Sequence, residues 1–157
     1  MGTAIGATID YLFAQLPAPC VAAQPDCVVV DGVSRGPVSR TMLWIGKSQP
    51  DDVQAASGPR VFPVLGVRQV QESFTIPCFI DVMRDGVYQT AARSAAISLY
   101  DVVCHLLVTD PGLGGTLSGG WYAQIKQAVL RQPEVVTQAS VRAVVTFEIE
   151  ATNRYQP

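Results

Sequence analysis

The side chains that could do redox or metal chemistry in this sequence are four cysteines and one histidine. Cys20, Cys27, Cys78 and Cys104 include no Cys-x-x-Cys pair, and His105 is the single histidine. This spacing predicts no metal site. Cys78 lies in an alternating apolar run and Cys104 in a helical one, so both are predicted to be small core residues. Because neighbouring side chains on a helix point about 100° apart, Cys104 and His105 are not expected to form a catalytic pair.

The glycine-rich segment at residues 112–120 could in principle cradle a phosphate group. A phosphate-binding loop needs a strand before it, a Lys-Ser or Lys-Thr end and a helix behind it. Here a helical pattern precedes the glycines and a strand pattern follows from Trp121. We interpret the segment as a connection after a helix that stops at Asp110 and Pro111. Asp51 and Asp52 are adjacent carboxylates with no third ligand or histidine nearby, and we interpret them as a solvated loop tip.

The elements that position these residues follow from the apolar periodicity. Residues 3–16 show helical spacing and predict one amphipathic helix, closed by Pro17 and Pro19. Residues 27–30 and 41–45 predict two short strands.

A long strand is predicted at residues 70–83, where apolar and polar side chains alternate except at Glu72 and Phe79. Pro77 cannot donate a ladder hydrogen bond, which indicates an edge strand or a bulge at that point. The Arg84-Asp85-Gly86 turn then leads into an alanine-rich helix at residues 88–107.

Two further strands are predicted to pair as an antiparallel hairpin. The first begins at Trp121 and places Ala123, Ile125 and Val129 on one face. The second has the clearest alternation in the chain, with apolar residues sharing one face from Val141 to the end of the strand. The order is therefore α-β-β-β-α-β-β. We predict an α+β fold, a mostly antiparallel sheet with helices packed on one face.

The chain has 157 residues, of which 48% are hydrophobic and 15% are charged. This composition predicts a single domain over residues 1–157, with a long loop region at residues 32–66. The net charge of -2 offers nucleic acid no general attraction. We see neither an apolar run near the roughly 20 residues that span a bilayer nor a signal peptide, and we expect synthesis in the cytoplasm.

The strands at residues 70–83 and 140–153 are long for a domain of this size. Each would span about 45 Å, whereas the domain has an expected diameter of about 40 Å. Strands that outreach their domain leave unpaired edges, and a neighbouring subunit is the simplest cover. The alternative is that bulges at Pro77 break the strands or that the strands curl over the helices.

These features together resemble the tail terminator, or tail-completion, proteins of long-tailed bacteriophages. The resemblance rests on the N-terminal helix at residues 6–12 with its valine-rich strand and Asp-Gly turn, on the strand at 69–82 that runs through Asp85-Gly86 into the alanine-rich helix, and on the final strand at 140–151. It covers nearly the whole chain. It carries over order and pattern, and no single functional residue.

The resemblance implies a virion structural protein of the tail and neck region, made in the host cytoplasm. Family members form a hexameric ring that caps the head-proximal end of the tail tube, stops its polymerisation and joins the head-side connector. The implied partners are copies of the chain itself, the tail tube protein and the connector or stopper protein. DNA would only pass through the lumen, without sequence-specific binding, and a mildly acidic chain suits that passage. No enzyme activity, cofactor, metal or membrane contact is implied.

Aromatic residues and arginines are enriched at the centres of interfaces, which gives a set of candidate contact residues. For contacts with the next subunit or the tail tube these are Arg35, Arg40, Trp44, Arg60, Phe62, Arg154 and Tyr155. Trp44 serves equally well as a plain core residue.

Three other functions stay open. One is a head-completion, stopper or other minor tail protein. Another is an enzyme or a small ligand-binding α+β domain, which would have a deep pocket beneath residues 112–120. The last is a stand-alone regulatory domain.

Overall fold

The computed structural model describes residues 4–32, 39–47, 56–58, 60–61, 70–86, 88–118, 122–133 and 140–155. These residues form three helices and six strands. In chain order they are α1 (Ala4–Gln15), α2 (Pro17–Ala23), β1 (Cys27–Asp31), β2 (Thr41–Ile45), β3 (Arg60–Val61), β4 (Val70–Asp85), α3 (Gln89–Thr109), β5 (Ala123–Arg131) and β6 (Ser140–Tyr155). The predicted α+β class and mostly antiparallel sheet are confirmed. The additions are α2 and the two-residue β3.

The helix α2 begins where the sequence indicated a helix end. Pro17 is its first residue, where a missing N–H costs no hydrogen bond and the fixed φ of proline suits a helix. The chain bends at Leu16, which is buried in the core. The prolines therefore redirect the chain into a second helix and do not release it into a loop.

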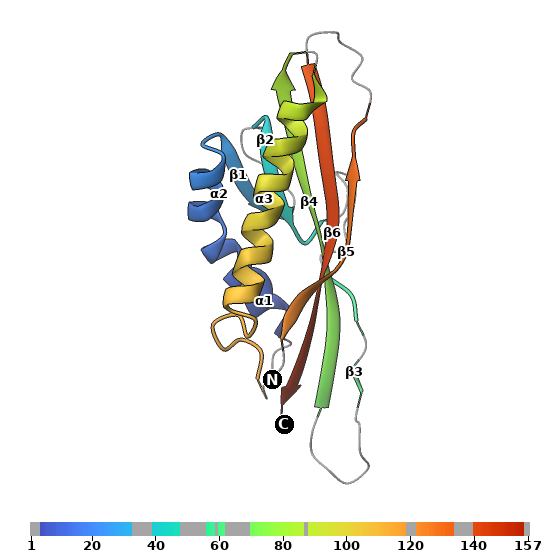
Figure 1. Cartoon of the computed structure of the whole chain (residues 1–157). Coiled ribbons are helices and arrows are strands. Elements are labelled where there is room, and N and C mark those ends of the chain that lie inside the picture. The colour runs from blue at the N-terminus through green and yellow to red at the C-terminus, as the bar shows by residue number, and fades with distance from the viewer. Residues whose placement is uncertain are drawn as a thin grey trace.

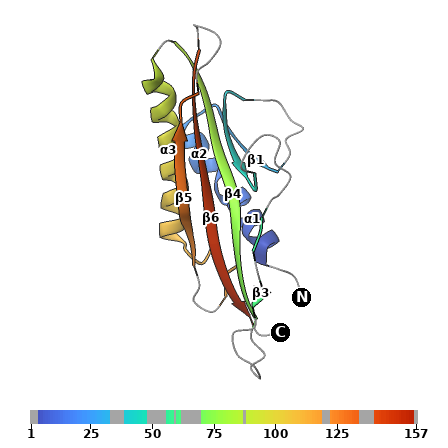
Figure 2. The ribbon, with the colours of Figure 1, turned by 90° about the vertical axis from the view of Figure 1, so that its right-hand side faces the viewer.

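The six strands form one sheet in the order β1-β2-β4-β6-β5, and β3 also pairs with β4. The β1 and β2 strands are parallel, and the other pairings are antiparallel. Figures 1 and 2 show the three helices on one side of this sheet. The other side carries no helix among the described residues and is called the open face below.

Strands β4 and β6 form a ribbon of unusual length. Their register runs without a shift from Val70 opposite Tyr155 to Asp85 opposite Ser140. A strand of 16 residues spans about 50 Å, more than twice the usual strand length. Figure 1 shows the lower ends of β4 and β6 extending past the last turn of α3.

The expectation of an edge strand or a bulge at Pro77 is wrong. β4 is an interior strand, and Pro77 pairs with Glu148 in unbroken register. The Pro77 carbonyl accepts a hydrogen bond from the Lys47 N–H, just beyond the end of β2. Because the N and C=O of one strand residue point to the same side, the missing N–H of Pro77 faces this side and leaves the β4–β6 ladder intact.

The predicted hairpin of β5 with β6 is confirmed, but its face assignment changes partway along. A register shift between Ile125 and Gln127 inserts one extra residue into β5. Since side chains alternate with period two, the shift moves Val129 to the open face, away from the face of Ala123 and Ile125. Leu130 then lies on the helix side, opposite Val145.

The core lies between the helices and the sheet. Small residues of α3, including Ala92 and Ala96, are fully buried and bring the helix close to β4 and β6. Within the described residues, α3 is also long and apolar enough to span a membrane by length and composition, which the sequence analysis did not expect. Its sheet-facing residues are buried, and core helices of soluble proteins pass the same test.

One buried polar cluster interrupts the apolar core at the lower end of the ribbon. The Glu72 side chain is 3% exposed, and its Oε2 accepts a hydrogen bond of 3.0 Å from the Ala4 N–H in the first turn of α1. A carboxylate at this place satisfies a free N–H and complements the positive end of the helix dipole. Opposite Glu72, the buried Asn153 accepts from the N–H and hydroxyl of Ser118.

Candidate interaction surfaces

The candidate contact residues within the described part of the chain fall into two groups along the ribbon. Arg60, Arg154 and Tyr155 lie at the lower end, where β3 and the last residues of β6 both pair with the start of β4. Arg40 and Trp44 lie alongside the upper part of β4. The structure therefore does not bring these residues together into one site.

Two of the candidates, Arg35 and Phe62, lie outside the described residues, as do the side chains of Arg60 and Tyr155. Asp51 and Asp52 also lie outside them.

Trp44 belongs to an aromatic cluster on the open face. Its ring stacks on Phe79, with ring centroids 5.4 Å apart and an interplanar angle of 11°. The Lys47 Nζ lies 5.1 Å from the centroid of the Trp44 ring, within the range of a cation–π contact. Phe79 is buried and Trp44 is half-buried, so this cluster is separate from the helix-side core.

The two candidate arginines with described side chains differ in their contacts. Arg40 forms an ion pair of 2.6 Å with Asp85, and both side chains are exposed. Such a pair contributes little to stability and exchanges readily for another partner. The Arg154 Nε is buried and has no hydrogen-bond partner among the described residues, while the Arg154 carbonyl accepts from the Ser118 hydroxyl.

The upper end of the ribbon is tied to the body by a polar network around Arg84. Its guanidinium donates to both oxygens of Asp26, to the Gln24 side chain at 2.8 Å and to the Thr41 hydroxyl at 2.6 Å. The Thr41 hydroxyl donates to Asp26. Burial raises the pKa of Asp26, but Thr41 and Arg84 outweigh burial and lower the pKa below its ordinary value.

The described part of the glycine segment, residues 112–118, packs against Tyr11 and bonds to Asp110. The Asp110 carboxylate accepts from the Gly114 N–H at 2.7 Å and from the Tyr11 hydroxyl. The hydrogen bond between the Tyr11 hydroxyl and Asp110 raises the pKa of Tyr11. Leu113 is fully buried with a φ of 51°, and a side chain at Gly114 would collide with the Tyr11 ring at 2.6 Å. This turn anchors α1 against the end of α3.

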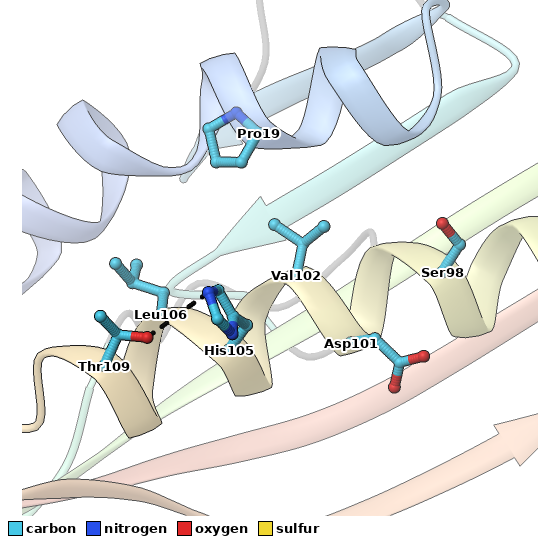
Figure 3. A pocket seen from close by; sticks show the side chains of 7 residues that line it. All are labelled: Pro19, Ser98, Asp101, Val102, His105, Leu106 and Thr109. Carbon is cyan, nitrogen blue, oxygen red and sulfur yellow. Dashed lines mark hydrogen bonds between the residues drawn. The ribbon is translucent and has the colours of Figure 1, made fainter.

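A groove of about 380 Å³ lies between α2 and α3, and Figure 3 shows it from close by. None of residues 112–118, the described part of the glycine segment, lines it. Its apolar wall includes Pro19 and Val102, and the polar side chains that line it within the described part of the chain come from α3. The His105 Nε2 and Thr109 Oγ1 are 3.5 Å apart, and the Asp101 carboxylate points away from α2. The polar groups therefore do not converge on one point.

Three of the four cysteines are buried in the core, and Cys104 is the exception. Cys20, Cys27 and Cys78 are buried, Cys104 is half-buried and all four are free. Burial raises the pKa of Cys78 to about 12. A hydrogen bond between the Cys20 and Cys27 thiols raises the pKa of Cys20 and lowers that of Cys27. No group of three metal-binding side chains occurs within the described residues.

The exposed side of β5 was not predicted from the sequence. Val129 is 36% exposed and Leu130 is 40% exposed, on an edge strand that pairs with β6 alone among the described residues. Val129 lies on the open face and Leu130 on the helix side. The signal in the sequence was the apolar triplet at residues 128–130, which breaks the alternation of this strand.

No known protein family and no curated protein matches this sequence.

Proposed function

We propose that this chain is a virion structural protein of a long-tailed bacteriophage, which assembles into a ring on the head-proximal end of the tail tube. The ring is hexameric, as in the tail terminator proteins that the sequence resembles. It stops tube polymerisation and presents its other rim to the head-side connector or stopper protein. This role needs shape and surfaces and no catalytic step.

The observation that carries the proposal is the β4–β6 ribbon, which pairs over 16 residues and outreaches the helical layer. A subunit of a ring that joins two different partners needs two ends and two sides. The ribbon supplies the two ends. Of the described candidates, Arg60, Arg154 and Tyr155 lie toward one end and Arg40 toward the other, while Trp44 lies opposite Phe79 near the middle of β4. The sheet edges β1 and β5 supply the two sides.

The open face fits a ring through which DNA passes without being held. Along β6 it carries Glu148 and Glu150, and Glu150 is met by Gln124 and Lys126 of β5. The same face of β6 carries two arginines, Arg142, which pairs with Asp81, and Arg154 at the lower end. Carboxylates repel phosphate, and cations that already face a carboxylate attract it less. A ring whose lumen is lined with free arginines would contradict this part of the proposal.

The test is to disable the gene in the phage or prophage that encodes this chain and to examine the products by electron microscopy. We expect free heads together with tails longer than the normal length, and we expect the intact chain supplied in trans to restore normal virions. Normal virions in the absence of the chain would refute the proposal. Free tails of normal length would instead indicate the stopper role. Cryo-electron microscopy of tail tubes mixed with the purified chain should show a ring at one end of each tube.

A further inference from the structure

We infer that copies of this chain join side by side through their sheets, with the β5 edge of one copy pairing with the β1 edge of the next. This inference deepens the proposed function, because it names the surfaces that would close the ring. It rests on the direction, register and side chains of the two edge strands.

The directions of the edge strands permit such a pairing. β1 is parallel to β2, β2 is antiparallel to β4, β4 to β6 and β6 to β5. β1 and β5 therefore run in opposite directions. A second copy placed beside the first by rotation about an axis along the strands brings β5 against an antiparallel β1, which can form a regular ladder.

The two edges also lie at the same level of the sheet. One row of paired residues runs from Ala128 on β5 through β6, β4 and β2 to Asp31 on β1. A second row runs in the same way from Arg131 to Val28. Four rows of paired residues therefore cross the whole sheet. Each row begins in the segment at residues 128–131 on one edge and finishes in the segment at residues 28–31 on the other edge.

Continuing these rows into the next copy pairs side chains of matching character. Leu130 meets Val29 on the helix side, and Val129 meets Val30 on the open face. Apolar pairs directly opposite each other are the unit of sheet stabilisation. Leu130 and Val129 are more than a third exposed in the single chain, so the pairing would remove apolar surface from water.

Charge favours this head-to-tail pairing over a pairing of β5 with another β5. The described β5 edge carries Arg131 and Lys126, of which Lys126 also faces Glu150, whereas β1 ends at the exposed Asp31. Two β5 edges would bring cations together, and a β5 edge beside a β1 edge brings opposite charges together. A contact between two different surfaces repeats from copy to copy and forms a ring when its rotation closes, whereas a β5–β5 contact stops at a dimer.

The test is a disulfide between two exposed positions of the shared row, Val28→Cys and Arg131→Cys in one chain. Directly opposed strand residues lie at a separation that a disulfide can bridge. Under mild oxidation we expect a ladder of cross-linked species at multiples of the monomer mass, which collapses on reduction. The matched control is Val28→Cys with Gln124→Cys, since Gln124 also lies exposed on the open face of β5 but seven residues further along. This control pair should give no ladder.

The single variants identify the competing contacts. Arg131→Cys alone should stay monomeric under oxidation, and a strong dimer band from it would show β5–β5 pairing and overturn the inference. Equal cross-linking by the test pair and the control pair, or none by either, would overturn it as well. A ladder from a chain whose deletion leaves virions normal would refute the proposed function and keep this inference. A ring whose subunits cross-link through surfaces other than the β1 and β5 edges would refute this inference and keep the proposed function.

Discussion

The side chains of β6 point alternately to the helix side and to the open face of the sheet, and the two sets differ in burial and in polarity. The helix-side residues, from Val141 to Ala151, are at most 5% exposed. Their open-face neighbours, from Arg142 to Glu150, are all half-buried and mostly polar. Because the two sets share one backbone, substitutions at neighbouring residues of β6 test the two faces separately. The helix side sets the free energy of unfolding, and the open face can change with little loss of stability.

The largest expected effect tests this comparison directly. Phe147→Asp places a charge among buried apolar side chains, including Tyr100, whose ring packs edge-on against Phe147. We expect this variant to unfold, since an unpaired buried charge costs more than a domain's marginal stability. Thr146→Asp, one residue away on the open face, should change the free energy of unfolding by less than about 1 kcal/mol. Circular dichroism with urea titration measures both. Equal effects would contradict the register of β6.

A smaller effect is expected from a polar residue on the helix side. Glu72→Ala removes the acceptor of the Ala4 N–H and should cost about 1–3 kcal/mol, because it leaves a buried donor unpaired. Glu72→Gln keeps an acceptor oxygen and should cost less. Gln71→Ala, the open-face neighbour, should stay within about 0.5 kcal/mol. Urea titration of the three variants measures the free energy of unfolding. It shows whether the loss depends on a position on the helix side or on the removal of any polar side chain.

The Arg142–Asp81 pair on the open face should have a smaller effect still. Arg142 donates through Nε and Nη2 to the two oxygens of Asp81 at 2.8 and 2.6 Å. Both side chains are partly exposed, so a double-mutant cycle should give a coupling of about 0.2–1 kcal/mol that falls with added salt. A coupling of several kcal/mol, independent of salt, would mean that the open face also determines folding.

The smallest expected effect is a pH dependence from Asp26. Its pKa is lower in the folded chain than in the unfolded chain, so the carboxylate stabilises the fold above the unfolded pKa of about 4. This stability is lost as the pH falls through the lower, folded pKa. Asp26→Asn should flatten the decline in melting temperature below about pH 4 and leave the value at pH 7 slightly lower. If Asp26→Asn left the decline in melting temperature below about pH 4 unchanged, Arg84 and Thr41 would not act on this carboxylate.

The sequence predicted the parts of the fold that regular alternation defines and missed the parts that single contacts define. The faces of β6 and the pairing of β5 with β6 followed from period-two patterns. Helix α2 did not, since Pro17 reads equally as a stop or as a first helical residue. The bulge after Ile125 depends on tertiary pairing and reversed the face of Val129.

The interaction surfaces were harder to predict than the fold. Arginine and aromatic composition selected Arg40 and Trp44, but it could not show that Arg40 is already paired with Asp85 or that Trp44 stacks on Phe79. Composition also gave no reason to select Leu130, because an exposed leucine and a core leucine look alike in a sequence. Only the strand order shows that Leu130 lies at a sheet edge.

The unbroken register of β4 and β6 has a mechanical consequence. A force that pulls one end of β4 against the opposite end of β6 loads the ladder between them in shear and shares the load over many hydrogen bonds at once. A ladder pulled apart from one end opens a single bond at a time and yields at a far lower force. A chain with this geometry resists stretching along the length of the ribbon.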